Sequence, residues 1–164
     1  MLIRFAKPLD AAAVVFIYNH YIDNSYATFE VERIDASDMQ RRIGEIQAAG
    51  YPFLVCEEGD EIVGFAYANR YKTRAAYQHS VEVTVYIRDG FGGKGVGTLL
   101  YEQLFSELKN ADIHAMVAGI SLPNDASVKL HEKFGFEKVA HFREVGRKFD
   151  RWIDVGYWEC LLAK

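Results

Sequence analysis

The stretch Val83–Leu100, VTVYIRDGFGGKGVGTLL, carries the strongest structural signal in the chain. It begins with the end of a Val-rich strand, passes through a segment with five glycines among eight residues (90–97), and continues into a pattern that predicts a helix. Glycines let the backbone turn its N–H groups inward, and a helix start adds free amide donors and the positive end of a dipole. Together these features predict a binding site for a phosphate-containing ligand.

A Gly-rich loop alone is a weak signal, and other interpretations apply to it. A Walker P-loop requires Ser or Thr directly after its Lys, whereas Gly95 follows Lys94. A dinucleotide-binding fold has an acidic residue at the end of its second strand, where this chain has Ile120 and Ser121. A tight turn without a ligand remains open, although the density of glycine favours binding.

Hydrophobic periodicity on either side of this loop predicts a mixed α/β (α+β) architecture. The predicted strands cover residues 3–6, 52–57, 61–70, 80–87, 114–120, 136–143 and 152–162, and the predicted helices cover 8–22, 37–49, 98–110 and 124–134. Because the strand–loop–helix–strand order around the Gly-rich loop forms a βαβ unit, we expect part of the sheet to be parallel. The length of 164 residues fits one domain spanning 1–164.

Composition and charge exclude several classes of protein. The net charge is −4 and no Lys/Arg cluster is visible, which argues against nucleic-acid binding. No apolar run has the length of a membrane span, and the apolar segment 11–18 lacks the cleavage pattern of a signal peptide. Cys56 and Cys160 fit no metal spacing and the five His residues show no ligand pairing, so we expect no metal and a reducing, cytoplasmic environment.

Two motifs resemble the GNAT superfamily of acyl-CoA N-acyltransferases. The stretch 85–100 is similar to the acetyl-CoA-binding motif of that family, and 124–136, NDASVKLHEKFGF, resembles its Asn-x-x-Ser/Ala-x-x-Leu-Tyr-x-x-x-Gly-Phe pattern. The resemblance covers almost the whole chain and implies a GNAT fold, with a mixed central sheet of about six or seven strands, helices on both faces, and acetyl-CoA as cosubstrate. Two positions depart from the pattern: Gly92 stands where the family loop usually begins with Arg or Gln, and His131 stands where the family often has Tyr.

The resemblance also implies a set of contacts with acetyl-CoA. The pantetheine arm would meet the strand before the loop, at Val85, Tyr86 and Ile87. The phosphate groups would meet the loop and the helix start, at Gly92, Gly93, Lys94, Gly95, Val96, Gly97 and Thr98. The second motif would add Asn124, Ser127 and Lys133.

Several stretches look like one branch of the superfamily, the phosphinothricin acetyltransferases and related amino-acid-sulfoximine acetyltransferases. These stretches are 81–86, 119–125, 129–132 and 152–158, and His131 is itself normal for this branch. The branch implies a detoxifying homodimeric enzyme that transfers acetyl directly, in a ternary complex, to the α-amino group of a phosphinothricin, methionine sulfoximine or methionine sulfone type of substrate. Acetylation of another small amine or of a protein N-terminus, and a non-catalytic acetyl-CoA sensor, remain alternatives.

Two side chains are candidates for the catalytic work. Glu82 is the only charge within Ser80–Ile87, and an acid in a strand is costly unless it is paired, neutral or functional. From the residues alone, Glu82 is as consistent with a structural salt bridge or an exposed face as with a general base. The resemblance, which places a proposed catalytic Glu at this position, makes Glu82 the candidate general base. A lone His is more often packed than catalytic, but its place in the family motif makes His131 a candidate to protonate the CoA sulfur or to relay a proton.

Candidate substrate contacts lie in two predicted connectors. Lys72 and Arg74, with Tyr77 beside them, supply cations suited to a carboxylate or another anionic oxygen. Phe29 and Glu30 occupy the place where the branch has substrate-site residues, and Glu30 is a candidate partner for the substrate ammonium. For each residue the alternative is a solvated loop position. The aromatic residues of the last strand are instead expected in the core or in a dimer interface, at Trp152, Tyr157 and Trp158.

Overall fold

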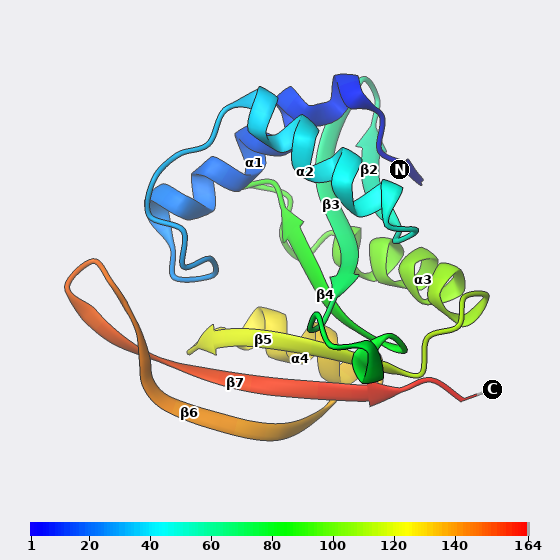
Figure 1. Cartoon of the computed structure of the whole chain (residues 1–164). Coiled ribbons are helices and arrows are strands. Elements are labelled where there is room, and N and C mark those ends of the chain that lie inside the picture. The colour runs from blue at the N-terminus through cyan, green and yellow to red at the C-terminus, as the bar shows by residue number, and fades with distance from the viewer. Residues whose placement is uncertain (164) are drawn as a thin grey trace.

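A seven-stranded mixed sheet is the centre of the structure, a computed structural model whose described part covers residues 1–163 (Figure 1). The strands are β1 (Leu2–Phe5), β2 (Phe53–Glu58), β3 (Glu61–Arg70), β4 (Ser80–Ile87), β5 (Ala115–Leu122), β6 (Glu137–Lys148) and β7 (Arg151–Leu161), in the order β1-β2-β3-β4-β5-β7-β6. The helices are α1 (Ala11–Asn24), α2 (Ala36–Ala48), α3 (Val96–Lys109) and α4 (Asp125–Lys133), with 3-10 turns at Pro8–Asp10 and Ala75–Tyr77. The predicted element order and mixed sheet are confirmed. A single domain over 1–164 stays a prediction, and Lys164 lies outside the described residues.

Helices cover both faces of the sheet, as predicted (Figure 1). On one face, α1 and α2 share a buried cluster with alternate residues of β2 and β3. Helix α2 buries Met39, Ile43 and Ile46, which recur at helical spacing. Its start is capped by Asp35, whose side chain accepts a hydrogen bond from the Asp38 amide at 2.7 Å.

The opposite face of the sheet is covered by α3 and α4. Leu100, Leu104 and Leu108 lie four residues apart on α3, and each is fully buried against the sheet. On α4, Val128 and Leu130 pack against the same cluster. With both faces filled, the middle of the sheet is a rigid frame for whatever lies at its edges.

The sheet opens between its two parallel strands. Pairing of β4 with β5 is limited to Ser80–Ala115, Val81–Met116 and Glu82–Val117. Beyond Glu82 the two strands continue without pairing to each other, and Figure 1 shows them diverging. The other strand pairs are antiparallel and form long ladders. Because unpaired backbone groups need other partners, this opening is a natural place for a ligand.

The sixth strand departs most from its predicted bounds. The sequence predicts 136–143, whereas β6 continues to Lys148. Its pairing with β7 shifts register between Lys138 and Ala140 and again between Phe142 and Gly146. These bulges, together with the exposure of most of the strand, break the alternation of apolar and polar residues on which a strand prediction depends.

Candidate active site

A cleft of about 1030 Å³ occupies the opening between β4 and β5. Its walls come from β4, β5 and β7, from the Gly-rich loop and the first turn of α3, from α4 along its length, and from the connector between α1 and α2. Most of the residues predicted to contact acetyl-CoA line it: Val85, Tyr86, Ile87, Gly92, Gly93, Gly95, Val96, Gly97, Thr98, Asn124, Ser127 and Lys133. Segments far apart in the sequence thus meet around one cavity.

The Gly-rich loop presents open backbone to this cleft. Gly93 and Gly95 have positive φ angles of 74° and 85°, and Gly95 is the N-cap of α3. A Cβ built at Gly92, Gly93 or Gly95 would meet no atom within 4 Å, so space is left beside the loop. Free amides at a helix start, with room next to them, fit a pyrophosphate.

The first turn of α3 packs against α4 beside this loop. A Cβ at Gly97 would stand 3.0 Å from a methyl carbon of Leu130, so a larger residue at position 97 would require the Leu130 side chain to shift. The Lys133 ammonium donates a hydrogen bond to the Thr98 hydroxyl at 3.1 Å. Lys94 lies outside the cleft lining, with its ammonium 4.5 Å from the centre of the Phe91 ring.

The start of α4 explains the motif Asn-x-x-Ser in structural terms. The Asn124 side chain accepts a hydrogen bond from the Ser127 amide at 3.2 Å, which caps the helix. Both residues also line the cleft. Their predicted contact with acetyl-CoA stays a prediction.

Glu82 lies where β4 and β5 part. It is the last residue of β4 that pairs with β5, and its side chain reaches into the cleft on the same face as Thr84 and Tyr86. No hydrogen bond or ion pair joins its carboxylate to another of residues 1–163. The carboxylate is accessible to solvent, but the surrounding walls desolvate it enough to raise its pKa above the ordinary value. An unpaired carboxylate with a raised pKa suits a general base.

His131 lies in the cleft wall with only 3% of its surface exposed. Its Nδ1 is 2.7 Å from the carbonyl oxygen of Ser127, so Nδ1 carries the proton and donates it. Its Nε2 is 2.7 Å from the Tyr101 hydroxyl, which therefore donates to Nε2. Burial lowers the pKa of His131, so the neutral imidazole is the stable form at neutral pH.

We expect Tyr101→Phe to destabilise the protein, because it leaves the buried Nε2 of His131 without a donor. The free energy of unfolding should fall by about 1–3 kcal/mol, measured by urea denaturation. Tyr51→Phe is the control, since the Tyr51 hydroxyl makes no hydrogen bond with the described residues. Equal stabilities of the two variants would show that the Tyr101–His131 bond contributes nothing.

Only some of the predicted substrate-binding residues lie in the cleft wall. Phe29 lines the cleft, whereas Lys72, Arg74 and Tyr77 lie outside its lining. The Lys72 ammonium is 5.2 Å from the ring centre of Tyr71 and 5.3 Å from that of Tyr77. Their role in substrate binding stays a prediction.

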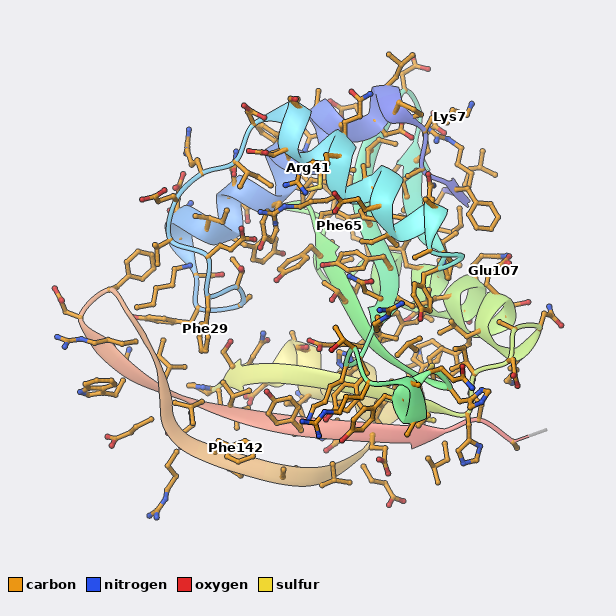
Figure 2. All side chains as sticks on the ribbon, in the orientation of Figure 1. Lys7, Phe29, Arg41, Phe65, Glu107 and Phe142 are labelled. Carbon is orange, nitrogen blue, oxygen red and sulfur yellow. The ribbon has the colours of Figure 1, made fainter. Side chains whose placement is uncertain are left out.

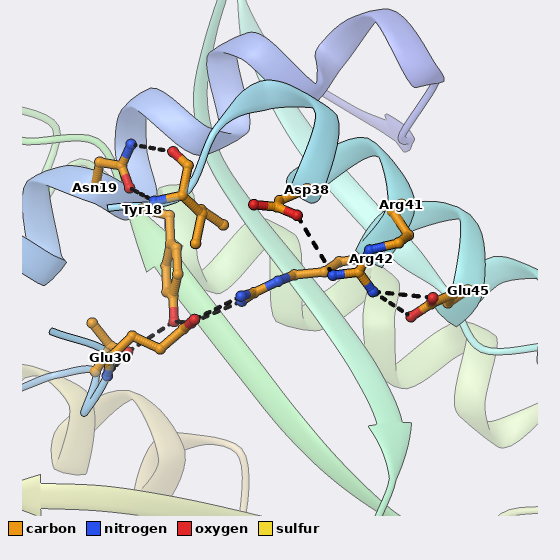
Figure 3. A network of polar contacts seen from close by, with 9 residues as sticks. Tyr18, Asn19, Glu30, Asp38, Arg41, Arg42 and Glu45 are labelled. Atoms are coloured by element: carbon orange, nitrogen blue, oxygen red, sulfur yellow. Dashed lines mark hydrogen bonds and ion pairs between the residues drawn. The ribbon is translucent and has the colours of Figure 1, made fainter. Parts of the chain in front are cut away.

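The carboxylate of Glu30 already has partners. Arg42 donates two hydrogen bonds to it, at 2.8 and 2.6 Å, and the Tyr18 hydroxyl donates a third (Figure 3). The guanidinium is the main reason that the pKa of Glu30 is lowered. The prediction that Glu30 meets a substrate ammonium is untested, and the carboxylate would have to serve both partners.

The cleft is also lined by residues that the sequence does not indicate as site residues, among them Tyr67, Ser121 and Tyr157. The expectation that Tyr157 lies in the core is wrong, because alternation along β7 turns Tyr157 into the cleft. The same alternation buries Trp158 in the core, as expected. No local signal distinguishes these residues, because they come together only when β3, β5 and β7 are side by side.

Residues 1–163 contain no group of three or more His, Cys, Asp or Glu that could hold a metal ion. Within the same residues, no helix is long and apolar enough to cross a membrane.

Comparison with known proteins gives the class. A family profile described as acetyltransferase (GNAT) domain matches residues 3–156. A phosphinothricin N-acetyltransferase from Streptomyces coelicolor is 40% identical over 92% of this chain and 90% of its own length. An L-methionine sulfoximine/L-methionine sulfone acetyltransferase from Salmonella typhimurium is 35% identical over 99% of this chain and 95% of its own length. The chain therefore belongs to the GNAT family of acetyltransferases.

Within that family the protein is an N-acetyltransferase, as the curated relatives are. The solved structure of the acetyltransferase yncA from Salmonella typhimurium, with its cofactor acetyl-CoA, has a TM-score of 0.96 and 34% identity to this chain. The match covers 99% of this chain and 94% of that one. The fold and enzyme class implied by the sequence motifs are confirmed.

Proposed function

We propose that this enzyme transfers acetyl from acetyl-CoA to the α-amino group of a small amino-acid analogue of the phosphinothricin, methionine sulfoximine or methionine sulfone type. The substrate class is supported by the names of the relatives. The chemistry rests on one observation: an unpaired carboxylate, Glu82, stands at the inner end of a cleft whose outer end is an open loop of backbone amides.

The backbone amides and open space of the cleft support acetyl-CoA as the acetyl donor. Acetyl-CoA supplies an activated thioester, and its pyrophosphate matches the amides and open space at Gly92, Gly93 and Gly95. We assign the phosphate groups to Gly92–Thr98, including Lys94 through its backbone and charge. The pantetheine arm belongs along Val85–Ile87, where β4 has no partner on the β5 side. We add Asn124, Ser127 and Lys133 as contacts from α4.

Glu82 is proposed as the general base. An amine is protonated at neutral pH and cannot attack a thioester until it loses a proton. The Glu82 carboxylate accepts this proton, directly or through water, and its raised pKa brings it closer to the pKa of the amine. A backbone N–H near Tyr86 stabilises the negative charge that develops on the thioester oxygen. Both substrates are then bound together, so the transfer is direct in a ternary complex.

His131 is proposed to take part in returning a proton to the sulfur. The imidazole is neutral, with its proton on Nδ1 and with Nε2 accepting a hydrogen bond from Tyr101. This form favours a proton relay through the ring over proton donation by an imidazolium. Tyr101 keeps its own proton, because burial raises the pKa of its hydroxyl. The proton that Nδ1 gives to the sulfur is instead replaced, through water, by the proton that Glu82 takes from the amine, so the amine loses one proton and the CoA thiolate gains one. Lys72, Arg74, Tyr77, Phe29 and Glu30 remain the proposed substrate contacts.

We also propose a cytoplasmic homodimer. Both cysteines are free thiols, which is consistent with a reducing compartment. Apolar side chains of the β6–β7 hairpin and its surroundings are exposed, and a second copy would cover them: Val139, Phe142, Val145, Phe149, Trp152 and Leu161. The dimer can be tested by analytical ultracentrifugation.

The substrate proposal is tested by CoA release across a panel of amines. The panel contains phosphinothricin, methionine sulfoximine, methionine sulfone, common amino acids, spermidine and an aminoglycoside, with acetyl-CoA as donor. Turnover confined to the amino-acid analogues supports the proposal. Turnover of spermidine or the aminoglycoside, without the analogues, overturns the substrate class. Acetyl-CoA binding without any turnover favours a sensor.

A further inference from the structure

The connector Ser25–Glu30, between α1 and α2, is held to the sheet through its backbone. Ser25–Thr28 form neither helix nor strand, yet each of their four carbonyl oxygens accepts a hydrogen bond from a side chain of β4, β5 or β6. The pairs are Lys148 to Ser25 at 2.7 Å, Ser121 to Tyr26, Tyr86 to Ala27 at 3.1 Å, and Lys148 to Thr28 at 2.9 Å. These donors stand on both sides of the opening between β4 and β5, so the connector bridges it.

Lys148 makes the most unusual of these contacts. It is the last residue of β6, only 3% of its surface is exposed, and its ammonium forms no ion pair with a carboxylate of residues 1–163. Besides Ser25 and Thr28, it lies 3.5 Å from the carbonyl oxygen of Tyr21 in the last turn of α1. Three N–H donors thus meet three carbonyls at the negative end of a helix dipole. Asp23 interacts with this ammonium electrostatically, but the direct partners of the ammonium are carbonyl oxygens, and burying a charge among them is costly.

The connector that Lys148 holds in place forms part of the cleft wall. Ala27, Thr28 and Phe29 line the cleft that contains Glu82. The Phe29 side chain points from the connector toward the β6–β7 hairpin (Figure 2), and its ring lies 2.3 Å from where a Cβ on Gly146 would stand. The ring therefore packs directly on the backbone of the hairpin, two residues before Lys148.

The connector is also fixed at its far end. Glu30 is held by Arg42 and Tyr18, and the Tyr18 hydroxyl lies 2.8 Å from that of Thr28 (Figure 3). The segment is thus anchored to α2 at one end and to β6 at the other. Thr28 and Phe29, between these anchors, line the same cleft as Glu82, and Tyr86, which donates to Ala27, shares one face of β4 with Glu82.

We propose that Lys148 is a positioning residue for the amine substrate. By drawing the carbonyls of Ser25 and Thr28 onto one buried ammonium, it holds Thr28 and Phe29 against the hairpin as a fixed wall of the amine-binding end. The residue touches no reacting atom. This inference rests on the proposed function, because it assigns that end of the cleft to the amine.

Lys148→Met tests the proposal, because it keeps the length and apolar stem and removes the ammonium. With the best amine of the panel, we expect its KM to rise by about tenfold or more, because a shift of the wall misplaces the amine. The KM for acetyl-CoA should stay within about twofold, because its proposed contacts lie on other elements. Lys148→Arg, which restores charge and donors, should recover most of the loss. Lys138→Met is the matched control, since Lys138 is an exposed lysine on the same strand.

A second readout does not depend on the amine. Amide hydrogen exchange should speed up in 25–30 in Lys148→Met and stay unchanged in 90–100. An unchanged exchange rate in 25–30, or equal losses of affinity for both substrates, overturns the positioning role. If Lys148→Met does not fold, Lys148→Gln keeps two N–H donors and is measured instead, with the same criteria. If the wild type acetylates no amine of the panel, the proposed function fails while the exchange data still decide the role of Lys148.

Discussion

The Glu82→Gln variant is expected to lose about 10²–10⁴-fold in kcat while its affinity for acetyl-CoA stays within about twofold of wild type. Gln fills the same volume at the end of the paired part of β4 but cannot accept a proton from an ammonium. No neighbouring side chain is bonded to Glu82 within the described residues, so the substitution should leave the fold unchanged. Steady-state kinetics and calorimetric titration with CoA measure the two quantities.

The pH profile gives an independent test of the same role. Burial raises the pKa of Glu82 above 4.5, and only the carboxylate form can accept a proton. Activity should therefore be present above this raised pKa and fall as the pH drops through it. The acid limb of kcat/KM in the wild type should have its midpoint above 4.5, and Glu82→Gln should lack that limb.

Glu137→Gln is the control for both experiments, because Glu137 is an exposed carboxylate at the start of β6. Its kcat and pH profile should match the wild type. Retention of more than about one third of wild-type kcat in Glu82→Gln would show that the base is another group.

The Gly93→Asp variant is expected to bind acetyl-CoA about 100-fold more weakly. The Gly-rich loop offers amides and open space, so a carboxylate at residue 93 would stand where we propose that the phosphate groups bind. A like charge within a few ångströms of a diphosphate costs about 2–4 kcal/mol at the dielectric of a partly exposed site. The dissociation constant of CoA, measured by calorimetry, reports this effect directly.

Two variants separate the charge from the backbone strain at this position. Gly93 has a φ of 74°, which any side chain adopts reluctantly, and Gly93→Asn adds the same strain as Asp without the charge. Gly59→Asp places the charge at another positive-φ glycine, in the turn between β2 and β3, away from the cleft. We expect much weaker effects from both. Equal losses in Gly93→Asp and Gly93→Asn would assign the loss to strain and contradict a phosphate site there.

The sequence predicts most of the residues that line the cleft at the Gly-rich loop and α4, because the signals for them are local. The glycines, the strand before them and the helix after them are contiguous, and the cap of α4 lies within a single motif. The βαβ unit also predicts that the strand of Glu82 has a parallel neighbour, as β5 is. What the sequence does not predict is that β4 and β5 pair over so few residues.

The amine half is harder to predict because its residues converge from distant segments. Lys148, Ser121 and Tyr157 come from β6, β5 and β7, and nothing in their neighbourhoods marks them. The interpretation of Glu30 as a partner for the substrate ammonium takes no account of Arg42, which lies twelve residues further along the chain, a spacing that no single helix brings together. Buried lysines are rare enough that sequence reasoning places Lys148 at the surface by default.

The short pairing of β4 with β5 divides the sheet into two blocks, β1–β4 and β5–β7–β6, that share only three residue pairs of ladder. Along the rest of this seam the blocks are joined by the hydrophobic cluster beneath α3 and α4 and by the bridging connector, and a molecule that fills the gap would add to these contacts. A donor substrate bound between the two blocks would therefore stabilise the fold by contacting both of them, in addition to serving as a reactant. The loaded enzyme gains stability according to RT ln(1 + [L]/Kd), so resistance to heat and proteolysis becomes a measure of how much acetyl-CoA surrounds it.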